Sequence, residues 1–266
     1  MNKKIINQVI ALFLILVLAS IIPADKQSIK GATSLTLRFG NKGQMLVREG
    51  VIDKDKLSAI YEGRGGIPEE IRGVLLGKIE ELVITEENAG IALNFLWALG
   101  LANKSKVLSD GQMMNPRYGG AENFASTGGW TLSRGVAMDH YGMHDLVDLS
   151  VKGEKRVENV ASNIYRPCCD NHTAFPDCNH GMAMLGALSL LGKLDASEDQ
   201  MYEVAYKLNR MWFPGEYAHL NSYLEKEKKI ASIEQMVGMK YMSASGHATI
   251  MKSLDESPES GSGCVV

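Results

Sequence analysis

The stretch TEENAGIALNFLWALGL, residues 85–101, carries the clearest pattern of a buried helix in this chain. Thr85 is a typical helix N-cap residue, and Leu93, Leu96 and Trp97 follow at helical spacing. Apolar residues also fill most of the other faces, which is typical of a helix at the centre of a domain. We therefore predict that this is the most buried helix of the protein.

Helical patterns extend on both sides of this segment. Pro68 opens a helix whose apolar stripe continues through Leu82, and Ser197 with Gln200 forms a capping box. Four more helices are predicted over residues 153–165, 177–191, 216–229 and 233–253. The strand-like alternation over residues 34–39 is too short to found a sheet. The pattern predicts an all-α fold, a single helical bundle-like domain over residues 34–254.

Residues 109–135 are the exception, because they are rich in glycine and lack periodicity. A loop of this length in a compact domain is usually a lid, a binding loop or disorder. Tyr118, Phe124 and Trp130 argue against disorder. Two interpretations remain open: a lid over a pocket, or a structural loop packed by its own aromatic residues.

Composition and charge limit the class of protein. Of the 266 residues, 45% are hydrophobic and 22% are charged, enough to bury a core, so disordered, collagen-like and small disulfide-stapled classes are excluded. The formal net charge of −3 leaves no excess of basic residues for a phosphate backbone. We expect no nucleic-acid partner, and the sequence identifies no protein partner.

The first residues have the plan of a secretory signal. Lys3 and Lys4 precede an apolar run over residues 9–22. Residues 1–24 are therefore predicted to be a cleaved signal peptide or, with an apolar run counted over 5–22, a membrane anchor. Both interpretations give the body of the protein an extracytoplasmic location. Residues 255–266, which include Cys264, are predicted to be a flexible Ser/Gly tail.

The sequence RPCCDNHTAFPDCNHGMAM, residues 166–184, is the motif with the most chemical potential. Asp177 is placed as a helix N-cap, which puts Cys178 at the first position of the helix. Free amides and the helix dipole stabilise a thiolate at that position. We therefore predict that Cys178 is more acidic than an ordinary thiol.

Three sulfurs and an imidazole in this motif form a set of metal ligands. Cys168, Cys169 and Cys178, with His180 or His172, make a Cys₃His set that suits zinc, and the soft sulfurs equally suit copper(I). The favoured interpretation is an exported protein that binds a soft metal ion for storage, delivery or sensing. No obvious general base accompanies these ligands, so the sequence predicts no particular reaction.

Two other interpretations use the same cysteines. In the first, Cys178 is the attacking thiolate of a thiol/disulfide redox centre, and Cys168 or Cys169 is its resolving partner. In the second, a disulfide to Cys178 pins the loop of a structural or interaction domain. A bridge between Cys168 and Cys169 is disfavoured, because vicinal cysteines close a strained ring.

Part of this motif is similar to a known family. Over about twenty positions, the residues Cys169-Asp170-Asn171-His172-Thr173, Asp177-Cys178 and Ala183 resemble the Cys-x-x-Cys-Gln-Asn…Asp-Ser…Ala signature of the thiol-reducing subunit of bacterial cytochrome c maturation. That family is exported, membrane-anchored and helical around a dithiol that handles the cysteines of apocytochromes. This chain has Arg166 where the first family cysteine aligns and Cys178 in place of the serine. The resemblance implies that a dithiol at a helix start is reactive, and the family's function is not carried over.

His140 and His144 form a second pair of ligand types, one helical turn apart and flanked by Asp139 and Asp145. Two imidazoles on one helix face, oriented by carboxylates, could hold a metal ion, alone or together with the cysteines. The other interpretation is a solvated helix face with two ordinary histidines, because Gly142 between them weakens a helix.

Overall fold

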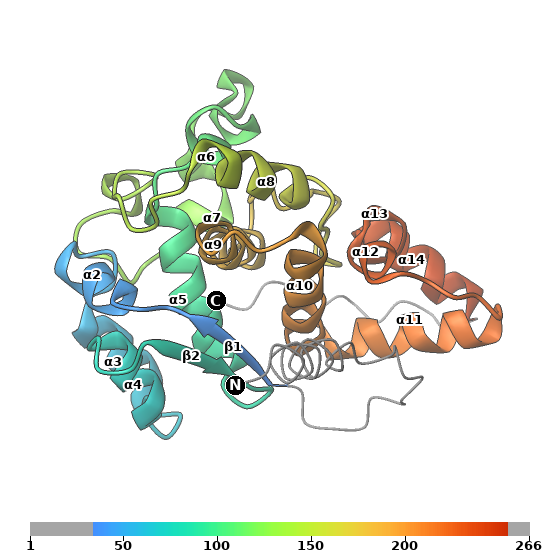
Figure 1. The fold of residues 1–266 in the computed structure, drawn as a ribbon, viewed down its shortest axis with the longest axis horizontal. Helices are drawn as coiled ribbons and strands as arrows, with labels where there is room; N and C mark the ends of the chain where they lie inside the picture. The colour runs from blue at the N-terminus through green and yellow to red at the C-terminus, as the bar shows by residue number, and fades with distance from the viewer. Residues whose placement is uncertain (1–33, 255–266) are drawn as a thin grey trace, which may run out of the picture. The chain divides into compact units, whose positions relative to one another are not determined.

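Two helices that cross at close range form the centre of the computed structural model, which describes residues 34–254 (Figure 1). The first, α5 (Ala89–Ala102), has 12 of its 14 residues buried, so the prediction of a central buried helix is confirmed. Its N-cap is Asn88 rather than Thr85. The Asn88 side chain accepts the Thr85 amide at 2.8 Å and donates to the Val83 carbonyl at 2.9 Å, which closes the turn before the helix.

The partner of α5 is α9 (Asn179–Lys193), and two glycines allow their close approach. A Cβ atom placed on Gly186 would lie 2.2 Å from the Leu96 carbonyl oxygen, and one on Gly100 would lie 2.0 Å from the Met182 carbonyl oxygen. Both contacts are with backbone, which cannot move aside as a side chain can. The crossing therefore depends on the absence of side chains at these positions.

A two-stranded antiparallel sheet packs beside α5. The strand predicted near residues 34–39 is present as β1 (Leu35–Arg38), and it pairs with β2 (Glu81–Ile84). The prediction that the helix opened by Pro68 continues through Leu82 is wrong, because α4 (Glu69–Leu75) ends before Gly77, which has φ +69°. Leu82 and Ile84 then alternate with exposed neighbours, as in a half-buried strand.

Short helices and turns surround this centre. They are α2 (Lys42–Arg48), α3 (Lys54–Glu62), α6 (Lys106–Ser109) and α7 (Ala125–Gly128), with 3₁₀ turns at Gln112–Met114, Pro116–Tyr118, Ala121–Asn123 and Ala137–Asp139. The glycine-rich loop is packed by its aromatic residues: Tyr118 and Phe124 both contact Phe175, at ring-centroid distances of 5.6 and 5.4 Å. Trp130 contacts Trp97 of α5 edge-on at 4.9 Å. These contacts favour a structural loop.

The remaining helices lie above and to the right of this centre in Figure 1. They are α8 (Val151–Ala161), α10 (Glu198–Trp212), α11 (Pro214–Lys226), α12 (Ile233–Val237), α13 (Met239–Met242) and α14 (Ala244–Ser253). The capping box of Ser197 and Gln200 starts α10, as predicted. The single helix predicted over 233–253 is wrong, because the extended backbone of Gly238 (ψ 171°) and Ser243 (ψ 161°) divides it into three.

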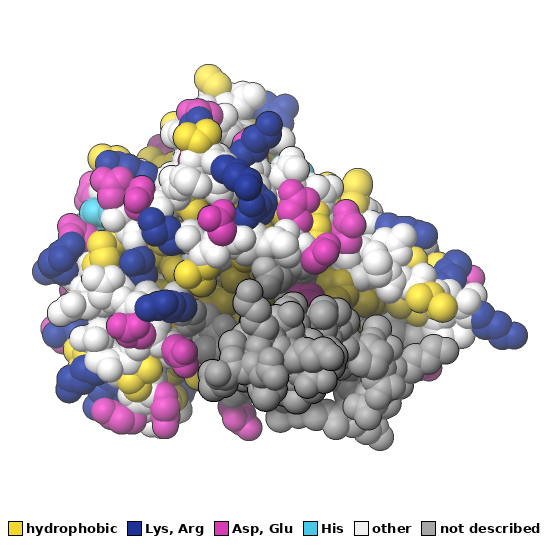
Figure 2. Space-filling view, viewed as in Figure 1, with side chains coloured by type: hydrophobic (Ala, Val, Ile, Leu, Met, Phe, Trp, Pro, Cys, Tyr) yellow, Lys and Arg dark blue, Asp and Glu magenta, His cyan; other side chains and the backbone are white. Residues whose placement is uncertain are grey.

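The described part of the chain is mostly helical, as the sequence predicts. The signal or anchor predicted over residues 1–24 and the tail predicted over 255–266, with Cys264, lie outside the described residues. Among the helices of residues 34–254, none has the length and apolar character needed to cross a bilayer. On the face shown in Figure 2, basic and acidic side chains are interspersed rather than gathered by sign.

Candidate metal centre

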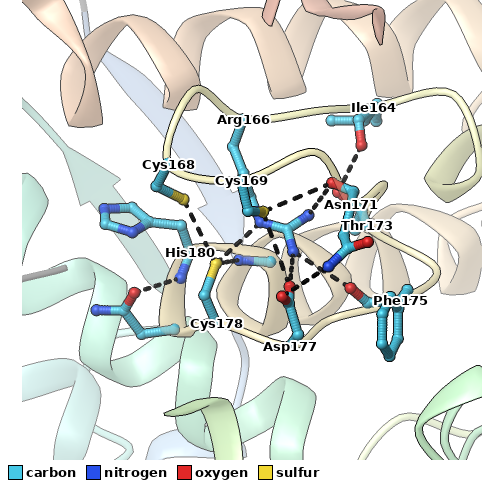
Figure 3. Close-up of polar contacts among 12 residues, drawn as sticks. Ile164, Arg166, Cys168, Cys169, Asn171, Thr173, Phe175, Asp177, Cys178 and His180 are labelled. Carbon is cyan, nitrogen blue, oxygen red and sulfur yellow. Dashed lines mark hydrogen bonds and ion pairs between the residues drawn. The ribbon is translucent and has the colours of Figure 1, made fainter. Parts of the chain in front are cut away.

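Cys178 lies at the start of α9 (Figure 3). It is the N-cap itself, with φ −121° and ψ 167°, and its Sγ accepts the Gly181 amide at 3.4 Å. The prediction that Asp177 is the N-cap and Cys178 the first helical residue is therefore wrong by one position. That Cys178 is more acidic than an ordinary thiol stays a prediction. Its physical reason is unchanged, because a sulfur that caps a helix faces its free amides and the positive end of its dipole.

Cys168 brings a second sulfur to Cys178. Their Sγ atoms are 3.7 Å apart, well beyond the disulfide bond length of about 2.05 Å. Two sulfurs bound at about 2.3 Å to one tetrahedral zinc ion lie about 3.8 Å apart. The observed spacing fits two ligands of a single ion, and in the metal-free centre it is that of a hydrogen bond between two thiols.

His180, in the first turn of α9, completes a group of three possible ligands. One of its ring nitrogens and the sulfurs of Cys168 and Cys178 all lie within 4.8 Å of one another. Its Nδ1 atom is buried and has no hydrogen-bond partner among residues 34–254. The ring is fixed by Phe213, at 4.6 Å between ring centroids, and by Trp212, at 5.6 Å. An imidazole nitrogen held in place without a hydrogen bond fits the role of a metal ligand.

Cys169 interacts with the other two thiols and also contacts two oxygen atoms. Its Sγ lies 3.9 Å from the Asn171 carbonyl and 3.8 Å from Asp177 Oδ1. The pKa of Cys169 is raised to about 11, because a hydrogen bond with Cys168, which lowers it, is outweighed by a hydrogen bond with Cys178 and by burial. Without a bound metal ion, the thiol therefore keeps its proton at neutral pH.

A second group of possible ligands consists of Cys169, Asp177 and Cys178. Both carboxylate oxygens of Asp177 already accept hydrogen bonds, Oδ1 from Arg166 and Oδ2 from Asn171 at 2.8 Å. Asp177 therefore has few lone pairs left for an ion, whereas Nδ1 of His180 accepts no hydrogen bond in the described part of the chain. Of the two, the group formed by Cys168, Cys178 and His180 is the better metal site.

Arg166 organises the loop that carries these cysteines. Its buried guanidinium donates to Cys178 Sγ at 2.9 Å, to the Asn171 carbonyl at 3.0 Å and to the Phe175 carbonyl at 3.2 Å. Burial alone would lower the pKa of Arg166, but the cysteine sulfurs and Asp177 raise it above its ordinary value. A permanent cation thus lies against Cys178 and favours its thiolate form.

His172 lies apart from both groups of ligands. Its ring contacts Tyr165 edge-on at 6.0 Å, and burial and the charge of Arg166 lower its pKa. Neither group of three ligands found in residues 34–254 includes His172. Of the two histidines left open by the sequence, His180 is the one that the fold brings to the sulfurs.

His140 and His144 also do not join the cysteines, since neither belongs to these groups. They lie on a turn after the 3₁₀ segment Ala137–Asp139 rather than on a helix, and Gly142 between them has φ +62°. The prediction that they share a helix face is therefore wrong. They nevertheless lie side by side, with His140 Nδ1 3.0 Å from His144 Nε2.

The cysteine loop is tied to the start of α14. The Ala244 amide donates to the Cys169 carbonyl at 2.9 Å, and Asp170 Oδ1 accepts the amide and the hydroxyl of Ser245, each at 2.8 Å. These hydrogen bonds from Ser245 lower the pKa of Asp170. The loop is thus held from one side by Arg166 and from the other by α14.

We expect Asp170→Ala to destabilise the protein by about 0.5–1 kcal/mol at neutral pH, the low end of a helix-capping contribution because the side chain is exposed. A carboxylate with a lowered pKa stabilises the fold above its unfolded pKa and loses that effect as the pH falls through the folded value. The difference between variant and wild type should therefore shrink below about pH 4, measured by urea unfolding at several pH values. Asp148→Ala, which removes an exposed carboxylate paired only with Lys193, is the control, expected within about 0.5 kcal/mol of wild type. An equal effect of both substitutions would contradict the role of Asp170.

His180 also borders a cleft of about 470 Å³. The first residues of α5, the first residues of α9 and Trp212 at the end of α10 line it, together with Arg64. The three-ligand group is thus adjacent to a space that a small molecule or a side chain of another protein could enter.

Arg166 and Phe213 are the residues of this centre that the sequence motif did not single out for a role. Arg166 is the first residue of the motif, and a basic residue beside three cysteines is a signal for a stabilised thiolate. Its contacts with Phe175 and Asp177, however, depend on how the loop closes. Comparison with known protein families, with curated proteins and with solved structures finds no match to this chain.

Proposed function

We propose that this protein binds a soft metal ion, zinc or copper(I), through Cys168, Cys178 and His180, and delivers it to an acceptor outside the cytoplasm. The observation that carries the proposal is the 3.7 Å spacing of the two sulfurs, with a ring nitrogen of His180 within 4.8 Å of both. The extracytoplasmic location rests on the secretory pattern of residues 1–24.

Charge balance favours zinc as the bound ion. The Arg166–Asp177 pair is neutral by itself, and two thiolates at Cys168 and Cys178 neutralise a divalent ion. The loaded centre then carries no net charge, which matters because uncompensated buried charge is costly. Copper(I) with the same thiolates leaves one negative charge, which Arg166 partly offsets through its contact with Cys178.

Delivery, rather than permanent structural binding, is supported by the number of ligands. Structural zinc sites are closed by four protein ligands, whereas sites that exchange or react keep a position open. The group in residues 34–254 supplies three ligands, and His180 borders the adjacent cleft. A ligand from an acceptor could therefore reach the ion and take it over.

Elemental analysis of reduced, metal-reconstituted protein tests this proposal. Wild type should retain about one equivalent of zinc or copper, because the site holds one ion. Cys168→Ser and Cys178→Ser should lose most of it. Cys169→Ser is the matched control and should retain the ion, because the Cys169 sulfur faces Asn171 and Asp177. Loss of metal in Cys169→Ser, with retention in Cys168→Ser, would contradict the assignment of ligands.

A thiol/disulfide redox function is the second candidate, favoured by the contact of Arg166 with Cys178 and by the nearness of Cys168. The two thiols would reduce a disulfide substrate to two thiols and become a disulfide themselves. Intact mass of protein isolated without reductant separates the candidates. A Cys168–Cys178 bridge, two mass units lighter, that cycles at a defined potential without metal favours redox chemistry, and a retained ion favours delivery.

A further inference from the structure

A group of nitrogen ligands lies at the C-terminal end of α5, separate from the cysteine centre. The Gly142 amide donates to the Leu101 carbonyl at 2.8 Å, and the His144 amide donates to the Ala102 carbonyl at 2.9 Å. This anchors the turn that carries His140 and His144. We propose that these two histidines bind a divalent transition-metal ion, with Glu49 orienting His144.

The proton on His140 is fixed by its surroundings. His140 Nε2 lies 2.9 Å from the backbone carbonyl oxygen of Arg134. A carbonyl oxygen only accepts hydrogen bonds, so Nε2 carries the proton. In neutral His140, Nδ1 is therefore the atom with the free lone pair, and it faces His144 Nε2 at 3.0 Å. A backbone carbonyl that orients a histidine in this way is the usual outer partner of a metal-bound imidazole.

His144 has a corresponding outer partner in Glu49. Its Nδ1 lies 3.8 Å from Glu49 Oε2, close enough to form a hydrogen bond after a small side-chain movement. With the proton on Nδ1 and directed at the carboxylate, the lone pair of His144 Nε2 faces that of His140 Nδ1. Without an ion, the 3.0 Å contact is a hydrogen bond in which His144 Nε2 donates to His140 Nδ1. An ion bound between these two nitrogens would replace that proton, and Glu49 would then stabilise the His144 tautomer that carries its proton on Nδ1.

The spacing of the two nitrogens indicates the class of ion. Nitrogens at about 2.0–2.1 Å from an ion lie about 2.9 Å apart in neighbouring positions of a square-planar or octahedral site, and about 3.4 Å apart in a tetrahedral one. The observed 3.0 Å is close to the first value. This geometry and imidazole ligands together favour nickel(II) or copper(II), with water in the remaining positions.

Access and charge both permit an ion here. His140 is only 6% exposed, whereas the side chains of His144 and Glu49 are 19% and 33% exposed, so the site opens on the His144 side. Two nearby cations are paired, Arg48 with Glu49 at 2.7 Å and Lys104 with Asp145 at 2.8 Å, and the Arg134 guanidinium donates to the carbonyl oxygens of Val47 and Arg48. The carbonyl end of α5, with its negative partial charge, adds to the attraction for a cation.

Nickel(II) binding by native mass spectrometry and calorimetry tests the proposal. We expect a full-length Cys168→Ser/Cys178→Ser protein, which lacks the cysteine ligands, to bind nickel(II). Adding His144→Gln should abolish this binding, and adding Glu49→Gln should weaken it about tenfold, as for an outer partner of a metal-bound histidine. His247→Gln is the matched control, because His219 and His247 form a similar imidazole pair, 3.3 Å between nitrogens, elsewhere in the fold.

The same histidine substitutions are also compared in the wild-type background, so that the test does not depend on the folding of the double cysteine variant. There His144→Gln should lose one nickel(II) equivalent, while His247→Gln loses none and both variants keep the cysteine-bound ion. Equal nickel(II) binding by wild type and His144→Gln, or an equal loss in His247→Gln, would overturn the proposal. This test compares nickel(II) binding by histidine variants. Failure of the cysteine site would instead appear as unchanged metal binding by Cys178→Ser, so the two failures can be told apart.

Discussion

Arg166→Met should destabilise the protein by about 3 kcal/mol, the low end of the cost of removing one partner from a buried ion pair. The side chain of Arg166 is 2% exposed and that of Asp177 is 19% exposed, so the substitution leaves a mostly buried carboxylate without its cation. The carbonyl oxygens of Asn171 and Phe175 lose their donors as well. Chemical denaturation followed by circular dichroism measures the loss.

Two further variants make this prediction specific. Arg156→Met is the control, because Arg156 is also mostly buried but bonds only a carbonyl and Asp195, which is 77% exposed; we expect a loss of about 1 kcal/mol or less. Arg166→Met/Asp177→Asn should recover part of the stability, since the second change removes the uncompensated charge. Stability of Arg166→Met within 1 kcal/mol of wild type would show that the pair does not hold the loop.

Gly186→Ala is expected to destabilise the protein by about 2–3 kcal/mol, the upper range for overpacking. The added methyl group would lie 2.2 Å from the Leu96 carbonyl oxygen and 2.9 Å from the Gly100 amide nitrogen. Because these are backbone atoms, α5 and α9 must separate to relieve the overlap. The gain in helix propensity on replacing glycine, about 1 kcal/mol, offsets only part of this cost. Thermal unfolding gives the measurement.

Gly90→Ala is the matched control for Gly186→Ala. Gly90 lies in α5, the other helix of the crossing, but a Cβ atom there meets nothing within 4 Å. It should be neutral or slightly stabilising, since alanine lowers the entropy of the unfolded chain. If Gly186→Ala is as stable as Gly90→Ala, the close crossing of α5 and α9 is not a determinant of the fold.

Local patterns predicted the fold where one signal dominated. The apolar surface of α5 and the capping box of Ser197 needed no knowledge of the tertiary structure. The helix predicted through Leu82 failed because Leu82 fits a helical stripe as well as a strand. Pairing with β1, nearly fifty positions earlier in the sequence, decides between them.

The candidate site was predicted in composition but not in arrangement. The density of cysteine and histidine over residues 166–184 identified the region. Which ligands converge depends on the path of the loop up to Cys178, which brings the Cys168 sulfur to Cys178 and the Cys169 sulfur to Asp177. Glu49 could not be connected with His144 from the sequence, because ninety-five positions separate them.

X-ray absorption at the zinc edge tests the central claim most directly. Reduced protein loaded with one equivalent of zinc should show two sulfur ligands at about 2.3 Å and nitrogen at about 2.0–2.1 Å. The spectrum of Cys169→Ser should be the same, because Cys169 is not one of the three proposed ligands and its Sγ contacts the Asn171 carbonyl and Asp177 Oδ1. A first shell of nitrogen and oxygen alone, or protein that retains no zinc, would contradict a metal centre formed by Cys168, Cys178 and His180.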